Sequence, residues 1–122
     1  MPGPDSSPID LAAVARWTGG SDELLYELID IFNADWPQRR AALREGIAGG
    51  DEVEARRVAH SLKTSLNVLG AASASEMARA LEGHFDRGEV AAAAPLVAQL
   101  ERDVDRIVAA LRDLRPSGGR PA

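Results

Sequence analysis

The stretch Ala59-His60-Ser61-Leu62-Lys63-Thr64-Ser65-Leu66-Asn67-Val68-Leu69-Gly70-Ala71 sets the pattern for the rest of the chain. Successive residues of a helix are rotated by about 100°, so the side chains here and in the preceding turn divide between two opposite faces. The polar face is centred on His60 and carries Arg56, Arg57, His60, Lys63, Thr64 and Asn67. The apolar face carries Ala55, Val58, Leu62, Leu66 and Leu69. The sequence therefore predicts a helix that packs on a core behind His60 and exposes the histidine to water.

A solvent-facing histidine with cations one turn to either side is a candidate functional residue. Packing does not explain its presence, and an imidazole can act as a nucleophile, an acid or base, or a ligand. An imidazole is mostly neutral near pH 7, so one ring nitrogen keeps a lone pair that can attack without help from a base. The alternative is that His60 is a solvent-exposed histidine without a function. Lys63, Arg56 and Arg57 would then only form a solvated face of the helix.

The N-terminal part of the chain predicts a disordered leader and a short helix. Residues 1–7 are rich in proline and glycine and have no apolar repeat to bury. A helix then opens at Pro8 or Asp10 and ends at Gly19-Gly20. Because it is too short to be stable alone, we expect it to lie across one end of a larger bundle.

Capping residues mark the second and third helices. Ser21 is a good N-cap, and an apolar stripe with three- and four-residue steps follows it as far as Gly49-Gly50. Pro37 removes one backbone hydrogen bond within the stripe, so we expect a kink at residues 33–36 rather than a break. Asp51 then caps the third helix, which runs to Leu69 and contains His60.

The last two helices follow from the same signals. Ser73 with Glu76 predicts the capped start of a fourth helix, which ends before Gly88. The fifth begins either near residue 89 or at Pro95, because the proline fits a first turn or a kink. Its apolar seam runs to residue 114, and residues 116–122 read as a flexible tail.

These elements predict an all-α protein. Four long amphipathic helices joined by very short connections alternate in direction, so we expect an antiparallel up-and-down four-helix bundle over residues 8–115 with the short N-terminal helix across one end. The third and fourth helices should be direct neighbours.

Composition bounds the function. The 122 residues are enough for one domain, and there is no cysteine to form a disulfide or a thiolate metal site. We expect no metal site. No apolar run could span a bilayer and no secretion signal is present, so we expect a cytoplasmic protein. The net charge of −5 argues against nucleic-acid binding, although residues 69–81 superficially fit a helix-turn-helix.

The chain resembles the histidine-containing phosphotransfer (HPt) family, whose motif reads roughly Ala-His-x-Leu-Lys-Gly-Ser followed by Gly-Ala. The matching residues are Ala59, His60, Leu62, Lys63, Ser65, Gly70 and Ala71. Weaker landmarks within Ile9 to Leu114 are Phe32, Asp35, Pro37, Leu43, Gly50-Asp51 and Leu81-Glu82. Thr64 stands where the family usually has glycine, which adds bulk beside His60.

The resemblance implies a phosphorelay intermediate. His60 would accept a phosphoryl group from an aspartyl phosphate on a receiver domain and pass it to an aspartate on another receiver, while Lys63 offsets the added negative charge. The implied partners are response-regulator receiver domains and a hybrid histidine kinase, which would meet a monomer through Arg56, Arg57, Ser61, Thr64 and Asn67. The chain would need no cofactor of its own, since the magnesium ion belongs to the receiver.

Other readings stay open at this stage. The chain carries no phosphate-binding loop or Walker signature, so it is expected to be a phosphocarrier and not an enzyme. The alternative function is a non-phosphorylated helical adaptor that docks to a receiver or a kinase through the His60 face. We expect His84 to have a structural role and Trp17 and Trp36 to pack in or at the edge of the core.

Overall fold

Five helices, and no strand, make up the part of the chain that the computed structural model describes, residues 8–114. They are α1 (Leu11–Thr18), α2 (Asp22–Ile47), α3 (Glu52–Val68), α4 (Ala72–Asp86) and α5 (Val90–Leu114). The predicted all-α class is therefore confirmed. The predicted leader, residues 1–7, and the predicted tail, residues 116–122, lie outside the described residues.

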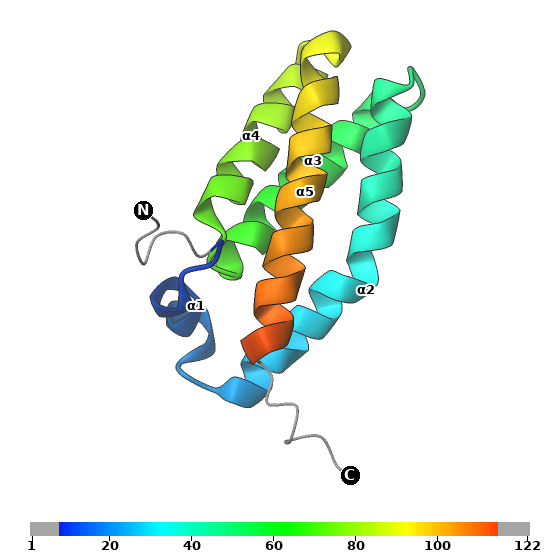
Figure 1. Ribbon diagram of the computed structural model, residues 1–122. Coiled ribbons are helices and arrows are strands. Elements are labelled where there is room, and N and C mark those ends of the chain that lie inside the picture. The colour runs from blue at the N-terminus through cyan, green and yellow to red at the C-terminus, as the bar shows by residue number, and fades with distance from the viewer. Residues whose placement is uncertain (1–7, 115–122) are drawn as a thin grey trace.

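The structure selects Asp10 over Pro8 as the start of α1 and confirms Ser21 as the N-cap of α2. The Asp10 side chain accepts a hydrogen bond of 3.0 Å from the backbone N–H of Ala12, and Gly19 ends α1 with a left-handed φ of 63°. The Ser21 hydroxyl accepts one of 3.1 Å at the start of α2. α2 continues through Pro37 without a break, and Figure 1 shows that it bends partway along.

The start of α4 differs from the prediction. Its N-cap residue is Ala71, which makes no side-chain hydrogen bond, so the prediction that Ser73 caps this helix with Glu76 is wrong. The reason is the tightness of the turn after α3. Gly70 adopts a φ of 76°, and the chain re-enters a helix directly after Ala71, before Ser73 is reached. α5 begins at Val90 and contains Pro95 in its interior, which selects the earlier of the two predicted starts.

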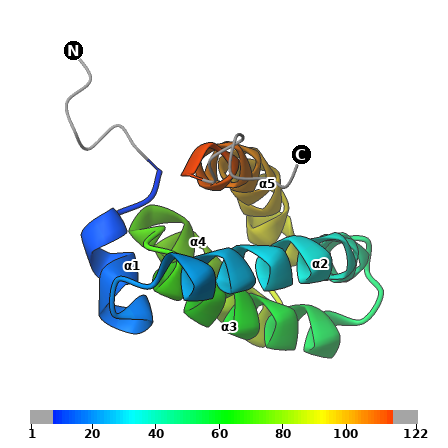
Figure 2. The same cartoon turned by 90° about the horizontal axis from the view of Figure 1, so that it is seen from below.

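The core lies between α2, α3, α4 and α5. Figures 1 and 2 show these four helices side by side, with α1 beside one end of them. α3 packs most extensively against α4, so the two are direct neighbours as predicted. The whole predicted apolar face of α3 is buried, and the largest fully buried side chains are Leu43, Leu62, Leu66, Leu69, Leu81, Leu100, Ile107 and Leu111.

Close backbone contact fixes α1 to the turn between α3 and α4. The Asp10 N–H donates a hydrogen bond of 2.7 Å to the carbonyl of Gly70. A Cβ atom on Gly70 would lie 2.4 Å from the Asp10 backbone oxygen and 2.9 Å from Val14 Cγ2. Glycine is therefore required here both by its left-handed φ and by the approach of α1.

The two tryptophans have different environments. Trp36 is buried and stacks on Phe32, with ring centroids 6.2 Å apart, so its predicted packing role is confirmed. Trp17 is 56% exposed, and the expectation that it packs in or at the edge of the core is wrong. The buried residues of α1 are Val14 and Thr18.

Candidate functional site

His60 lies in the middle of α3 with its side chain 60% exposed. Leu62 and Leu66, which lie on the opposite face of the helix, are fully buried. The orientation predicted from helix periodicity is therefore confirmed. The imidazole is accessible to a partner protein over most of its surface.

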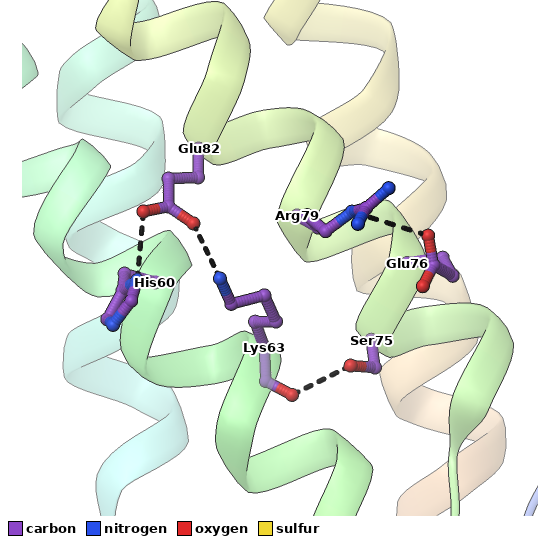
Figure 3. A network of polar contacts seen from close by, with 6 residues as sticks. All are labelled: His60, Lys63, Ser75, Glu76, Arg79 and Glu82. Carbon is purple, nitrogen blue, oxygen red and sulfur yellow. Dashed lines mark hydrogen bonds and ion pairs between the residues drawn. The ribbon is translucent and has the colours of Figure 1, made fainter.

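Glu82 of α4 connects His60 with Lys63. One carboxylate oxygen lies 2.8 Å from His60 Nδ1, and the other accepts a hydrogen bond of 3.1 Å from Lys63 Nζ. Figure 3 shows the Glu82 carboxylate pointing from α4 toward both α3 side chains. The side chains of Lys63 and Glu82 are only 30% and 22% exposed, so this network is better shielded from water than the imidazole.

The ionisation of Glu82 decides which ring nitrogen is free. Burial raises the pKa of Glu82, but the hydrogen bonds from Lys63 and then His60 outweigh burial and hold this pKa below its usual range. Glu82 is thus ionised at neutral pH, and an ionised carboxylate can only accept hydrogen bonds. Nδ1 of neutral His60 must then carry the proton, which leaves the lone pair on Nε2.

A buried serine holds α4 in place beside α3. Ser75 is a buried residue, with 8% of its surface exposed. Its hydroxyl donates a hydrogen bond of 2.8 Å to the carbonyl of Lys63. Glu82 lies two turns further along α4 on the same side of the helix. The Ser75 hydrogen bond therefore helps to fix the position of Glu82 beside the histidine.

Two of the predicted site residues are engaged elsewhere. Arg57 Nε donates a hydrogen bond of 2.9 Å to Glu54 of its own helix, and Arg56 lies 4.0 Å from Asp86 of α4. Neither arginine is bonded to His60. Their contacts therefore favour a role on the protein surface over direct neutralisation of charge at the imidazole ring. Of the remaining predicted residues, Ser61 is half-buried, and Thr64 and Asn67 are exposed.

A small groove between α2 and α3 runs beside the histidine face. Arg39 crosses one wall, donates a hydrogen bond of 3.0 Å to Ser65 Oγ and lies 3.6 Å from Asp35. Ile31 is 58% exposed on the same groove. The groove is lined by Leu28, Ile31, Phe32, Asp35, Arg39, Thr64, Ser65, Val68 and Leu69. It gives the exposed histidine an apolar neighbouring surface.

The second histidine has the structural role that was predicted. His84 Nδ1 lies 2.8 Å from Glu89, which also accepts a hydrogen bond of 3.0 Å from Arg87. These contacts close the turn between α4 and α5 and lie apart from the Glu82 network. α4 ends at Asp86, two residues after His84, so Arg87 and Glu89 follow directly in the turn.

The sequence named Glu82 only as a weak family landmark and gave it no role. It lies one residue after the buried Leu81, and a charged residue at the edge of an apolar stripe is common on amphipathic helices. The usable signal is its distance from the turn, because His60 and Glu82 are each eleven residues from Ala71.

The described residues form an all-α domain with an exposed histidine, which contacts a carboxylate and has a lysine one turn away. This arrangement is typical of a helical domain whose reactive group is a histidine. Residues 27–110 match the Hpt domain family, and this chain belongs to that family. Hpt domains carry out histidine phosphotransfer in two-component systems, as phosphocarriers that interact with receiver domains and kinases. No curated protein and no solved structure matches the chain.

Within residues 8–114, no helix is long and apolar enough to cross a membrane. No three His, Cys, Asp or Glu side chains there gather into a group that could hold a metal ion. The expectation that this chain needs no cofactor of its own remains a prediction.

Proposed function

We propose that the chain is a phosphorelay intermediate in which His60 accepts a phosphoryl group from a receiver domain and passes it to another receiver. The observation that carries the proposal is the exposed imidazole whose Nδ1 is held by Glu82 at 2.8 Å. This arrangement directs the Nε2 lone pair outward, where the aspartyl phosphate of a docked receiver would meet it.

The chemistry needs little more than position and charge. The Nε2 lone pair attacks phosphorus, the bond from phosphorus to the aspartyl oxygen breaks, and its electron pair stays on the receiver's carboxylate. The ring gains a positive charge as the N–P bond forms, and the Glu82 carboxylate beside Nδ1–H stabilises that charge. The reverse sequence of bond changes hands the phosphoryl group to an aspartate on the next receiver.

Lys63 is proposed to offset the negative charge of the phosphoryl group. Its ammonium group already lies in the network at 3.1 Å from Glu82 and one helical turn from His60. The receiver supplies the magnesium ion, so His60 and Lys63 complete this chain's share of the reaction. The chain is then a phosphocarrier and not a kinase, working in the cytoplasm as a monomer.

The face around His60 is proposed to dock the receivers and a hybrid histidine kinase. Thr64 and Asn67 are exposed on it, Ser61 is half-buried, and Arg56 and Arg57 add positive charge at its edge. An antiparallel four-helix bundle presents this face on one side of α3, with α1 placed across the far end. The apolar groove beside Thr64 supports docking of a protein surface over binding of a small molecule.

The test is incubation of the chain with a panel of receiver domains from the same genome, each carrying radiolabelled aspartyl phosphate. Acid-labile label should appear on the wild-type chain and not on His60→Gln. Retained acid-labile label on the variant would contradict the assignment of His60. Receivers that bind the chain without labelling it would instead favour the adaptor function.

A further inference from the structure

The Thr64 side chain is left without a structural role by the fold. It is exposed, so it adds nothing to the core, and threonine is among the weaker helix formers. A helical threonine often donates its hydroxyl to the carbonyl four residues earlier, but no described residue is hydrogen-bonded to this hydroxyl. The hydroxyl is therefore available to an outside group.

Its position places this hydroxyl beside the reacting atoms. Lys63 and Thr64 both follow His60 by one turn, at about 60° to one side of it and about 40° to the other. Lys63 turns toward Glu82 of α4, as Figure 3 shows, whereas Thr64 lines the groove on the α2 side. A phosphoryl group brought to His60 would thus have an ammonium on one flank and a hydroxyl on the other.

We propose that Thr64 gives the chain a second activity, the hydrolysis of the aspartyl phosphate on a docked receiver. This inference rests on the proposed function, because it needs the same docking. The Thr64 hydroxyl accepts a hydrogen bond from a water molecule and holds it in line with the phosphorus atom. Thr64 is a positioning residue, and the water is the nucleophile.

The bond changes balance without a further reactant. The water oxygen attacks phosphorus, the bond from phosphorus to the aspartyl oxygen breaks, and its electron pair stays on the receiver's carboxylate. The water's proton passes to the released inorganic phosphate. Since the transition state of phosphoryl transfer is loose, a residue that only orients the attacking water can accelerate the reaction without a general base.

Transfer and hydrolysis then compete for one phosphorus atom. When Nε2 of His60 attacks, the phosphoryl group is conserved, and when the water attacks, it is lost as phosphate. Glu82 holds the imidazole from the α4 side, which leaves the α2 side, where Thr64 lies, for the water. The chain would therefore set both the forward flow and the lifetime of its partner's signal.

The experiment uses a receiver domain that labels the wild-type chain, loaded with a phosphate label by phosphoramidate. His60→Gln removes transfer, and release of inorganic phosphate is followed with saturating variant. We expect release at least about tenfold above that of the receiver alone. Adding Thr64→Val, which keeps the branched shape and removes the hydroxyl, should return release to the rate of the receiver alone. Adding Thr64→Ser should preserve it.

Each outcome decides the proposal. Release by His60→Gln that equals the receiver alone, or that is unchanged by Thr64→Val, overturns it. Loss of receiver binding by Thr64→Val while Thr64→Ser still binds would assign the hydroxyl to docking and also overturn it. Failure of the proposed function would look different, because the wild-type chain would then acquire no label from any receiver.

Discussion

Replacing Glu82 by glutamine removes the charge that joins His60 to Lys63 and keeps the size of the side chain. The carboxylate accepts hydrogen bonds at 2.8 and 3.1 Å and is 22% exposed. Exposed ion pairs contribute up to about 1 kcal/mol, and hydrogen bonds to charged groups up to about 3 kcal/mol when they are buried. Because the imidazole is mostly in solvent, we expect Glu82→Gln to lower the free energy of unfolding by about 1 kcal/mol at pH 7.

This loss of stability should depend on pH in a defined direction. The pKa of Glu82 is lower in the folded protein than its usual value, so the folded state favours the ionised form. The stabilisation is fully present above the usual glutamate pKa of about 4.3 and disappears as pH falls through the lower, folded value. The difference between the parent protein and Glu82→Gln should therefore shrink in acid, as measured by urea unfolding at a series of pH values.

A matched variant on the same helix separates this effect from a general loss of charge. Among residues 8–114, Glu76 pairs only with Arg79, at 3.5 Å, and both side chains are mainly in water. Glu76→Gln should change the free energy of unfolding by no more than about 0.5 kcal/mol at any pH. If the Glu82→Gln difference stays constant down to about pH 3, or equals that of Glu76→Gln, the inferred ion network is wrong.

The same variant has a consequence for phosphotransfer. The glutamine amide can still meet Nδ1, but it does not stabilise the charge that the ring gains when Nε2 bonds to phosphorus. Transfer from a labelled receiver should be slower by about tenfold, which corresponds to about 1.4 kcal/mol in the barrier. An unchanged transfer rate would mean that Glu82 only packs α4 against α3.

Three further predictions test the fold and the site. Leu62→Ala, which opens a cavity in a fully buried position, should cost about 2–5 kcal/mol, whereas His60→Gln should stay within about 0.5 kcal/mol; comparable losses in urea unfolding would argue against the orientation of α3. Lys63→Ala should slow phosphotransfer or shorten the lifetime of the phosphohistidine, and a parent-like rate and lifetime would remove Lys63 from the site. Gly70→Ala should cost more than Gly88→Ala. Both residues have a positive φ, and the left-handed conformation alone costs about 1–2 kcal/mol, but only at Gly70 would a Cβ also meet the backbone of Asp10, the N-cap of α1. Equal losses would refute the close contact of Gly70 with the start of α1.

Helix periodicity was sufficient to predict the buried and exposed faces of α3. The burial of Ala55, Val58, Leu62 and Leu66 and the exposure of His60 follow from rotation about one axis, and no long-range contact is needed to derive them. The capped starts of α1, α2 and α3 were predictable for the same reason, because each cap is a bond between residues two or three apart.

The prediction failed where tertiary contact outweighs local preference. Ser73 has the residue type of an N-cap, yet α4 starts earlier, because Ala71 is fully buried and the turn must bring α4 directly against α3. A local signature cannot reveal this, since the position of α1 on Gly70 helps to fix the same turn. The prediction for Trp17 was wrong for a related reason, because an apolar residue on a short helix is buried only if a neighbouring element covers it.

The contact between His60 and Glu82 could have been predicted from the sequence by using the geometry of the turn between α3 and α4. When two antiparallel helices are joined tightly, residues equally far from the turn lie at the same height. His60 and Glu82 are each eleven residues from Ala71, and Arg56 and Asp86 are each fifteen, and both pairs are in contact. What the sequence could not supply was the rotation of α4 about its axis, which the Ser75 bond to the Lys63 carbonyl helps to fix.

The sharing of one carboxylate by a histidine and a lysine bears on how readily the phosphoryl group can enter and leave. Lys63 Nζ is paired with the Glu82 carboxylate at 3.1 Å, so under the proposed function an arriving phosphoryl group would compete with Glu82 for the ammonium. The competition is moderate, because these are partly exposed groups. In the proposed transfer the ring also acquires positive charge, so the interaction of Glu82 with His60 strengthens while its interaction with Lys63 weakens. The carboxylate therefore limits the change in electrostatic free energy between the two states, which suits a carrier that must pass the phosphoryl group on.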